Sequence, residues 1–532
     1  MQDVSAQTDP LARPPRPQAR PEAPVTDIPL SYALAPPDAT RRMGADFTLD
    51  TIDIRPVVHI LGRIMIALAV LMLPPLLVDW RQGSSNAPAF LASFLITGIT
   101  GTLLALATRG TGAQALSIRQ AYLLTSLIWS VLPVFGALPF MLGEPHLSLA
   151  DAYFESVSGI TTTGATVIYG LDLLPDGTNL WRGLLNWTGG LGIVFVAMIF
   201  MPVMRVGGMQ MFRAEGFDTF GKVLPRAQDI AKALLQVYLI LSLVVYLTYL
   251  GLGMRTLDAL VNAMATVSTG GFSSSDTSFS GYIPAVDYMA AVFMLAAALP
   301  YVRYIQLIRG EAAPLWRDPQ VRFFLALTAL ATAIVTTWAM VHLEMPLSTA
   351  LRESFFNLVS IGTGTGFFAG SFAYWEGPAL VVAFIIGLVG GCSGSSTGAL
   401  SSFRVLLTLK IIGARILQIQ SPNRVIPLRY DGQRVEQDVV DSLILFTSAF
   451  FGGIGIFAVA MTLVGVDSYS ALMGAWMALS NIGYGFGPLV VATGTFIDYP
   501  DAAKWLMSLA MLLGRLGLLS IFVLLLPRFW HR

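Results

Sequence analysis

Four segments of the 532-residue sequence repeat one pattern, and this repeat limits the fold more than any other feature. Each is a short amphipathic stretch that ends in small and hydroxyl-bearing residues around a glycine. Each is also too short and too polar to cross a membrane. The segments are 151–165, 257–272, 354–367 and 472–486. Their key glycines, Gly164, Gly271, Gly366 and Gly483, lie 107, 95 and 117 residues apart, which predicts an internal structural repeat.

Apolar runs on both sides of each segment place this repeat in a membrane. A transmembrane helix needs about 20 mostly apolar residues. Ten candidates lie near 57–78, 88–108, 119–142, 181–204, 229–251, 283–307, 320–343, 376–410, 437–465 and 502–526. Composition agrees, because only 12% of the residues are charged, against about 25% in soluble domains. We predict an all-α integral membrane protein in which each repeat contains a helix, a half-helix, a glycine loop and a second helix.

The same patterns divide the chain into successive parts. A proline-rich cytoplasmic tail at 1–56 lacks the pattern of a signal peptide and is expected to be disordered. Two transmembrane helices at 57–108 follow it. The four repeats are expected at 119–204, 229–307, 320–410 and 437–526, with a short cytoplasmic end at 527–532. A single cysteine excludes a disulfide framework, and four scattered histidines argue against a histidine-built metal site.

Lys and Arg predict which side of the membrane each loop faces. With the amino terminus in the cytoplasm, 26 of the 32 Lys and Arg residues lie inside, and Arg515 lies within the last helix. The exterior receives 15 of 32 acidic residues against five basic ones, a balance of 5 − 15 = −10. The five are Arg81, Arg182, Arg255, Arg352 and Lys504. All four half-helices are then external, and a negative entrance concentrates cations. Ordinary topological sorting also explains the basic interior, but not the acidic exterior.

The four glycine loops have the chemistry of a monovalent cation site. A half-helix entering from outside directs the negative end of its dipole toward the centre. Backbone carbonyls can replace the water around a cation, and glycine permits the positive φ that turns successive carbonyls inward. The candidate ligands are Thr162, Thr163, Gly164, Thr269, Gly270, Gly271, Gly364, Thr365, Gly366, Asn481, Ile482 and Gly483. The alternative is that these glycines only pack the helices of an ordinary transporter.

A run of small residues interrupts the apolar stretch near 376–410. Residues 390–398 read GlyGlyCysSerGlySerSerThrGly, and each glycine costs a helix about 1 kcal/mol relative to alanine. We expect this segment to unwind below the third glycine loop. Close helix packing is the alternative, since small residues let membrane helices approach. Cys392 is expected to be a packing residue rather than a redox switch.

Arg515 lies within the apolar run 511–519. A charge at that depth usually faces a cavity or a partner rather than lipid. Snorkelling to the membrane surface is the alternative, but the end of the predicted helix, near 526, is far from Arg515.

These motifs resemble those of the potassium-uptake superfamily that includes bacterial TrkH, TrkG and KtrB and the plant HKT transporters. The matching stretches are ThrThrThrGlyAla at 161–165, SerThrGlyGlyPheSer at 268–273, the small-residue run at 390–398, GlyArgLeu at 514–516 and ProArgPheTrp at 527–530. The resemblance covers roughly residues 57–532. The two helices before the repeats fit the TrkH branch best.

The resemblance implies a single-chain, pseudo-fourfold pore whose filter glycines are Gly164, Gly271, Gly366 and Gly483. Gly270 and Gly364 compete for this role in loops two and three, and aligning Phe272 with Phe367 favours Gly271 and Gly366. In the fourth loop, Tyr484 stands where the family commonly has proline. The resemblance also implies an intramembrane gate at Gly390, Gly391, Cys392, Ser393, Gly394 and Gly398, with Arg515 as an electrostatic barrier to cations.

The residues and the resemblance together predict potassium uptake across the bacterial inner membrane, with no catalysis and no cofactor in this chain. The family implies a homodimer and a separate nucleotide-binding cytoplasmic subunit of the TrkA type, and no nucleic-acid partner is expected. Whether uptake is a symport with protons or sodium stays open. The alternatives are a sodium- or proton-coupled secondary transporter of a small solute, or a weakly selective monovalent cation channel.

Overall fold

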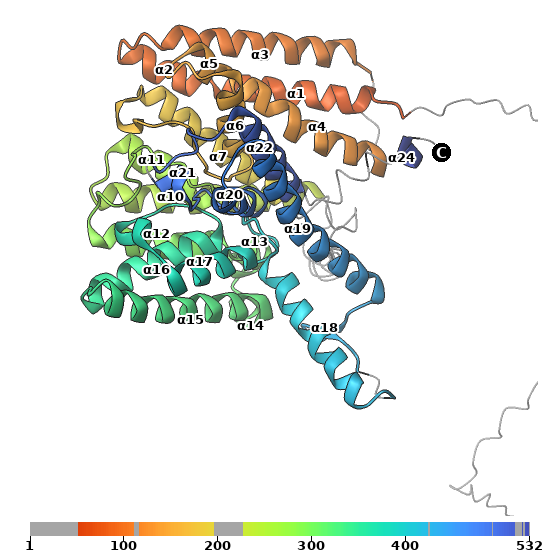
Figure 1. The fold of residues 1–532 in the computed structure, drawn as a ribbon. Coiled ribbons are helices and arrows are strands. Elements are labelled where there is room, and N and C mark those ends of the chain that lie inside the picture. The colour runs from red at the N-terminus through yellow and green to blue at the C-terminus, as the bar shows by residue number, and fades with distance from the viewer. Residues whose placement is uncertain are drawn as a thin grey trace, which may run out of the picture. The chain divides into compact units, whose positions relative to one another are not determined.

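The computed structural model describes residues 52–110, 116–195, 227–423, 426–491, 493–516, 524 and 527–530. Almost all of these residues are helical, and the helices follow one another as two leading spans and four repeats (Figure 1). Most of the predicted tail 1–56 and of the loop after the first repeat lies outside the described residues.

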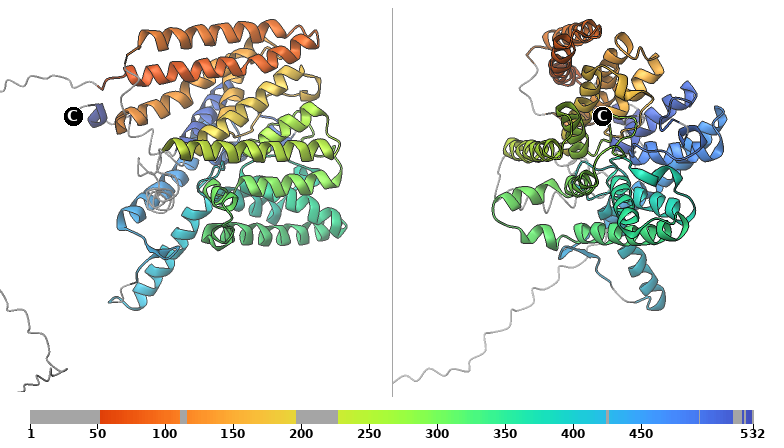
Figure 2. Two further views of the ribbon diagram at one scale, coloured as in Figure 1. Left: turned by 180° about the vertical axis from the view of Figure 1, so that it is seen from behind. Right: turned by 90° about the vertical axis from the view of Figure 1, so that its left-hand side faces the viewer.

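The part before the first repeat is a pair of antiparallel spans. Its helices are α1 (Arg55–Leu71), α2 (Leu73–Arg81) and α3 (Ala87–Ala107). α1 and α3 lie side by side in Figures 1 and 2. They approach closely at two glycines, because a Cβ added at Gly62 would lie only 2.7 Å from the Gly101 carbonyl oxygen. Small residues allow this close helix packing.

Each repeat then contains a first helix, a half-helix and a second helix, which confirms the predicted fold class. The first helices are α4 (Ile118–Gly136), α10 (Ala227–Gly251), α15 (Pro319–His342) and α19 (Gln437–Leu463). The half-helices are α6 (Leu149–Ile160), α11 (Thr256–Ser268), α16 (Leu347–Thr363) and α20 (Ser468–Ser480). The second helices are α7 (Asp176–Phe195), α12 (Pro284–Ala297), α17 (Gly377–Val389) and α22 (Asp501–Leu516).

Further elements lie between these helices or after them. The additional helices are α5 (Leu138–Leu142), α13 (Tyr301–Ile308), α14 (Ala313–Arg317), the longer α18 (Ser402–Gln420), α21 (Pro488–Val491) and, after the last repeat, α24 (Pro527–Trp530). Two 3₁₀ turns, η2 (Leu171–Leu173) and η4 (Gly370–Tyr374), follow the first and third half-helices. A hairpin of β1 (Arg429–Tyr430) and β2 (Gln433–Arg434) is a small departure from the predicted all-α fold.

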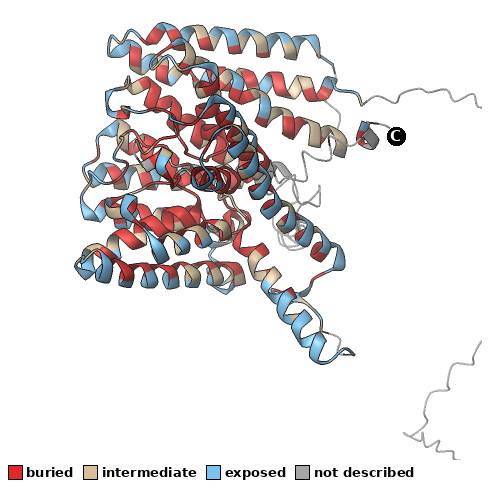
Figure 3. Cartoon of the chain, viewed as in Figure 1, coloured by how far each residue is buried: buried red, intermediate tan, exposed pale blue. Residues whose placement is uncertain are grey.

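The four repeats close into a ring around the half-helices. The second helix of each repeat packs against the half-helix of the next, as α7 on α11, α12 on α16 and α17 on α20. α22 of the fourth repeat returns to α6 of the first. Each half-helix is thus enclosed between neighbouring repeats, and Figure 3 shows that buried residues concentrate in this region, whereas the second half of α18 is largely exposed.

Of the ten predicted spans, 181–204 and 502–526 extend beyond the described residues. Six helices in the described part are long and apolar enough to cross a membrane, and α12 with α13 makes a seventh if this pair, bent by 95°, counts as one span. Pro300 lies within the break of that pair, directly before α13, and cannot continue an α-helix hydrogen-bond ladder. α17 stops at Val389, where Gly390 takes a positive φ of 70°.

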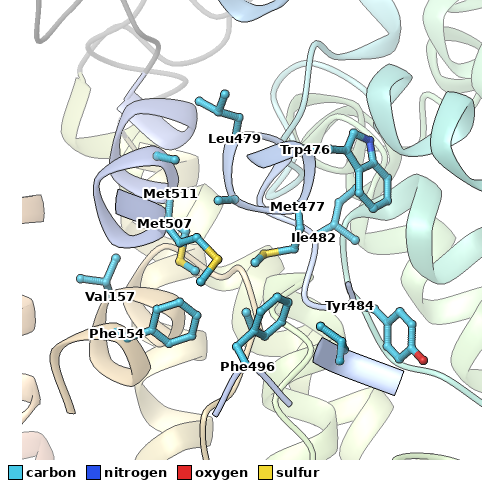
Figure 4. Packing of buried hydrophobic residues seen from close by; sticks show 14 of the residues in the cluster. Phe154, Val157, Trp476, Met477, Leu479, Ile482, Tyr484, Phe496, Met507 and Met511 are labelled. Carbon is cyan, nitrogen blue, oxygen red and sulfur yellow. The ribbon is translucent and has the colours of Figure 1, made fainter. Parts of the chain in front are cut away.

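The core between the first and fourth repeats is filled by flexible and aromatic side chains. Figure 4 shows Phe154 of α6, Met477 of α20, Met507 and Met511 of α22 and Phe496 converging there. Methionine fills irregular gaps well because its side chain is unbranched and flexible. This packing fixes α20 and α22 against α6 and so positions the ends of the half-helices.

Candidate ion-binding site

Each half-helix ends in a loop that begins with a left-handed residue. We define the candidate filter loops as residues 162–164, 269–271, 364–366 and 481–483. Their first residues, Thr162, Thr269, Gly364 and Asn481, have φ angles of 51°, 50°, 75° and 52°. Three of these four residues carry a side chain, in a conformation that usually favours glycine. The chain therefore turns in the same way at the same step of every repeat.

The second residue of each loop is tied back to its half-helix. Its backbone N–H donates to the carbonyl five residues earlier. The pairs are Thr163 to Ser158 at 2.8 Å, Gly270 to Ala265 at 2.8 Å, Thr365 to Ser360 at 2.8 Å and Ile482 to Met477 at 3.1 Å. One capping hydrogen bond of this kind satisfies a carbonyl at each helix end. The four loops thus share one backbone geometry.

This shared geometry gives the register of the loops. The third positions are Gly164, Gly271, Gly366 and Gly483. Gly270 occupies the second position, with Thr163 and Thr365, whereas Gly364 occupies the first, with Thr162. The backbone repeat therefore pairs the same four glycines that the sequence alignment on Phe272 and Phe367 pairs.

The expected reason for glycine is wrong at the fourth position. Gly164, Gly271 and Gly366 have φ angles of 83°, 75° and 83°, but Gly483 is not among the residues with positive φ. What excludes a side chain at Gly483 is proximity. A Cβ there would lie 2.8 Å from the Thr163 carbonyl oxygen and 2.9 Å from the carbonyl carbon of Gly164.

The four glycines face one another in a closed ring. A Cβ on Gly164 would lie 2.9 Å from the Cα of Gly271, and one on Gly366 would lie 2.5 Å from the Cα of Gly483. A Cβ on Gly271 would overlap the carbonyl oxygen of Thr365. Together with the contact of Gly483 on the first loop, these approaches connect all four repeats at one level.

The carbonyls of the second loop residues accept no hydrogen bond within the described part of the chain. No hydrogen bond from another described residue reaches the backbone oxygens of Thr163, Gly270, Thr365 or Ile482. Thr163, Thr365 and Ile482 are fully buried. A buried backbone carbonyl ordinarily finds a donor, and these oxygens also lie at the carboxyl ends of four half-helices, where the helix dipole is negative. The four loops therefore create a negative electrostatic potential that favours a cation.

The side chains of the loops brace the ring in two different ways. The hydroxyls of Thr161 and Thr163 lie 2.8 Å apart, and those of Thr363 and Thr365 lie 2.7 Å apart. In the fourth loop, the Asn481 amide donates to the Thr163 hydroxyl at 2.9 Å and to the Met511 carbonyl at 3.0 Å. Asn481 thus joins the fourth loop to the first through its nitrogen.

Residues 390–401 form a non-helical loop between α17 and α18, and we call them the intramembrane loop. Its Cys392 N–H donates to the Ala298 carbonyl and the Tyr301 N–H donates to the Gly394 carbonyl, both at 3.0 Å. Cys392 is buried, with 1% of its surface exposed. At the other end of the loop, a Cβ on Gly398 would lie 3.0 Å from the Cβ of Asn481. The loop therefore lies directly against the fourth candidate filter loop.

Arg515 links this loop to the ring. Its Nη2 donates to the Thr162 hydroxyl at 2.6 Å and also to the Ser396 carbonyl. The Thr269 hydroxyl donates to the same carbonyl at 3.1 Å. Arg515 is 7% exposed, and it forms no ion pair with any described carboxylate. A buried guanidinium thus sits between two candidate filter loops and the intramembrane loop.

A small cavity of about 60 Å³ borders the intramembrane loop. Ser393, Ser395, Thr397, Arg404 and Arg515 are among the residues that line it. The ring of Phe446 covers the Arg404 guanidinium at 4.1 Å, a cation–π contact. The cationic side chains of Arg404 and Arg515 therefore face the cavity next to the four candidate filter loops, on the side opposite to the starts of the half-helices.

Sequence reasoning missed a buried ion pair behind the first loop. Glu155 accepts from Arg182 Nε at 2.8 Å, and the two side chains are 0% and 1% exposed. Glu155 also accepts from the Val167 N–H at 3.0 Å. Arg182 donates to the Ser273 carbonyl at 2.7 Å and stacks on Phe272 at 4.2 Å. A carboxylate within an apolar half-helix was the available signal.

Asn357 holds the outgoing backbone of the third repeat as Glu155 holds that of the first. Glu155 and Asn357 each lie nine residues before the loop glycine and hold the backbone twelve residues later, at Val167 and Ala369. Asn357 makes two such bonds, accepting from the Ala369 N–H at 3.0 Å and donating to its carbonyl at 2.9 Å. Both residues fix the strand that leaves a candidate filter loop.

Two of the five basic residues assigned to the exterior are paired and buried rather than free. Arg182 is bound to Glu155, and Lys504 Nζ lies 2.6 Å from Asp151 while 4% exposed. Arg255 is exposed but bridges Asp176 and Asp258, at 2.9 and 3.1 Å. It borders a cavity of about 400 Å³ that Asp172 also lines. By the residue counts of the sequence, acidic residues outnumber basic ones on the face where the half-helices begin.

This arrangement suits a dehydrated monovalent cation. It offers uncharged oxygens from four loops, negative helix ends and an acidic approach. The part of the chain that the structure describes holds no group of three or more His, Cys, Asp or Glu residues that could hold a metal ion. The charge at the ring is partial rather than formal, which favours weak binding and release over permanent capture.

Comparisons with known proteins give a consistent family. A protein-family model described as "TrkH: Cation transport protein" matches residues 86–532. The chain is 38% identical to the Trk system potassium uptake protein TrkI of Halomonas elongata, over 90% of this chain and 97% of that protein. It is 33% identical to the Escherichia coli K12 Trk system potassium uptake protein TrkH, over 90% and 99%.

A solved structure shares the fold. The crystal structure of the potassium transporter TrkH from Vibrio parahaemolyticus superposes with a TM-score of 0.83 at 31% sequence identity. The match covers 90% of this chain and 100% of that chain.

Proposed function

The chain belongs to the TrkH family of cation transport proteins, a multi-pass membrane transporter and not an enzyme, and on that premise we propose that it takes up potassium through the ring of four candidate filter loops. The relatives named above are potassium uptake proteins, which supports potassium as the transported ion. Potassium is here the substrate, and the chain needs no cofactor for this process.

One observation carries the proposal. Four backbone carbonyls, on Thr163, Gly270, Thr365 and Ile482, occupy the same position of the four candidate filter loops and accept no hydrogen bond from a described residue. A potassium ion that exchanges its water for such oxygens keeps its coordination without a formal countercharge. Thr162, Thr269, Gly364 and Asn481 set the turn directly before these residues, and Gly164, Gly271, Gly366 and Gly483 allow the loops to approach.

The orientation follows from the charge distribution. We place both termini in the cytoplasm of a bacterial inner membrane, with the half-helices beginning at the outer face. Potassium then enters through the acidic outer face and moves inward down the membrane potential, which supplies about 2.3 kcal/mol per charge for each 100 mV.

The intramembrane loop and Arg515 form the gate. Arg515 bonds Thr162 and Ser396 at once, so it places a positive charge beside the path while the loop packs against Asn481. Opening requires these bonds to break and the loop to withdraw. Gly390 and Gly394, with φ angles of 70° and 81°, supply the flexible positions. Gly391, Cys392, Ser393 and Gly398 complete the moving segment.

Family membership supports two partners. We propose a homodimer and a cytoplasmic nucleotide-binding subunit of the TrkA type that controls the gate. α18, which carries Arg415 and leads to the hairpin at 429–434, extends from the intramembrane loop, and its second half is largely exposed (Figure 3). A partner that binds α18 would therefore pull directly on the gate.

Rubidium uptake into potassium-transport-deficient bacteria tests the proposal. We expect saturable uptake that resists sodium and disappears in Gly164→Asp, because a carboxylate cannot fit beside Gly270 and Gly271. Western blotting of membranes controls for expression. Uptake that sodium abolishes would indicate the weakly selective channel instead. Uptake that Gly164→Asp leaves intact, or a solute taken up only with sodium or protons, would exclude the filter.

A further inference from the structure

Neighbouring repeats meet along four seams at the outer side of the candidate filter loops, and the seams are not held in the same way. We number them by their repeats, so that the seam between the third and fourth repeats is seam 3–4. Each seam positions two strands that leave the ring. The contacts across a seam therefore decide how far apart two candidate filter loops can move.

Hydrogen bonds cross three of the seams. Across seam 1–2, Arg182 donates to the Ser273 carbonyl at 2.7 Å. Across seam 2–3, the Phe279 N–H donates to the Phe368 carbonyl at 3.1 Å. Across seam 4–1, the Phe496 N–H donates to the Thr166 carbonyl at 2.8 Å. Such bonds, which hold an outgoing strand to the neighbouring repeat, resist the separation of the two repeats.

Seam 3–4 is different. Among the described residues, no hydrogen bond or ion pair joins 347–389 to 468–500. Aromatic rings fill the seam instead. The ring centroid of Tyr484 lies 4.4 Å from that of Phe372 and 5.3 Å from that of Phe368, and Phe486 lies 5.3 Å from Phe372. These separations are those of favourable aromatic pairs.

Tyr484 is also the residue directly after Gly483. It is 6% exposed, and Figure 4 shows it following Ile482 on the same strand, with its hydroxyl oxygen directed away from the other labelled residues. Gly483 in turn lies so close to Gly366 that a Cβ on Gly366 would be 2.5 Å from the Cα of Gly483. A shift of the Tyr484 side chain therefore moves Gly483, which is one peptide bond away, and so changes the position of the fourth candidate filter loop.

We propose that Tyr484 is a positioning residue for ion selectivity, whose ring holds the fourth candidate filter loop against the third repeat in place of the hydrogen bonds that hold the other seams. This proposal rests on the proposed function, because it takes the four loops as the filter. The hydroxyl plays no part in it, and the aromatic ring does all of the positioning.

The test compares two matched variants. Phe367 directly follows Gly366, as Tyr484 follows Gly483, and its ring packs 4.5 Å from Phe279 across the hydrogen-bonded seam 2–3. Rubidium uptake is measured in potassium-transport-deficient bacteria for wild type, Tyr484→Ala, Tyr484→Phe and Phe367→Ala. For each protein, the sodium concentration that halves rubidium uptake is compared with the potassium concentration that does so.

We expect Tyr484→Ala to lower the preference for potassium over sodium by about tenfold, equivalent to about 1.4 kcal/mol. Tyr484→Phe should retain the wild-type ratio, and Phe367→Ala should change it far less than Tyr484→Ala. If Tyr484→Ala does not reach the membrane, Tyr484→Leu, which fills most of the space without an aromatic ring, replaces it.

Two results would overturn the proposal. One is a wild-type ratio in a well-expressed Tyr484→Ala or Tyr484→Leu protein. The other is an equal loss of selectivity in Phe367→Ala, which would mean that any ring beside the filter has this effect. Both results leave the proposed function standing, whereas a wild-type chain that transports no rubidium with its regulator present would contradict the proposed function itself.

Discussion

Replacement of Arg182 by glutamine should destabilise the protein strongly. In the native structure, Arg182 Nε lies 2.8 Å from Glu155, and the two side chains are 1% and 0% exposed. The substitution leaves Glu155 charged and buried with only the Thr166 hydroxyl and the Val167 N–H as donors. It also removes the guanidinium that covers Phe272 and holds the Ser273 carbonyl.

The magnitude follows from this burial. Removal of one partner of a fully buried ion pair costs about 3–5 kcal/mol, since an uncompensated charge remains in a medium of low polarity. An exposed pair of the same kind contributes only about 0.2–1 kcal/mol. Arg255, which is 56% exposed and bridges Asp176 and Asp258, provides that comparison in the same protein. Arg182→Gln should therefore lower the free energy of unfolding several times as much as Arg255→Gln does.

The assay is thermal unfolding in detergent. The measured quantity is the fraction of protein that still elutes as a single peak in size-exclusion chromatography after heating. Wild type, Arg182→Gln, Arg255→Gln and Glu155→Gln are compared with the double variant Glu155→Gln/Arg182→Gln. The double variant removes both charges, so it should be more stable than the two single losses added together.

Similar unfolding midpoints for Arg182→Gln and Arg255→Gln would refute this reasoning. So would strictly additive losses in the double variant, because they would mean that Glu155 and Arg182 do not depend on each other. Either result would remove the ion pair from the account of how the first two candidate filter loops are held.

Other variants probe the ring and the gate. Gly366→Ala should abolish rubidium uptake at normal membrane abundance, because the position has a φ of 83° and its new Cβ would lie 2.5 Å from Gly483, whereas Gly413→Ala, at an exposed site with nothing within 4 Å, should transport normally. Arg515→Gln should raise uptake without the regulatory partner by about tenfold or more, since hydrogen bonds to a charged group contribute about 1.5–3 kcal/mol each; a silent or slower variant would favour a purely structural arginine. Asn357→Ala should lose about 1–3 kcal/mol through its two bonds to Ala369, measured by the same unfolding assay; an unchanged midpoint would show that the outgoing third strand needs no clamp.

Much of the architecture could be predicted because its signals are local. Apolar runs of helical length and the repeated glycines sufficed for the leading helices, the four half-helices and the all-α membrane class. The break at Gly390 was also predictable, since a run of small residues has little helical preference. The span 283–307 was predicted as one continuous helix, although Pro300 was a signal for the bend between α12 and α13.

The details of the site depend on contacts between distant residues, which no local pattern encodes. Glu155 and Arg182 are 27 positions apart in the chain, and Arg515 meets Thr162 across 353 positions. Gly483 lacks the positive φ of the other three glycines. Its close neighbours in the first loop, rather than its φ, exclude a side chain at this position. The burial of Arg182 and Lys504 against acidic partners likewise became evident only in three dimensions.

The proposed filter requires that a cation exchange its water for the carbonyls of four loops. Anomalous diffraction from crystals grown in rubidium tests it most directly. We expect an anomalous peak enclosed by the backbone oxygens of Thr163, Gly270, Thr365 and Ile482, and we expect this peak to weaken when potassium replaces rubidium. Rubidium bound only at the acidic outer cavity near Asp172 and Asp258, with no peak within the ring at saturating concentration, would contradict it.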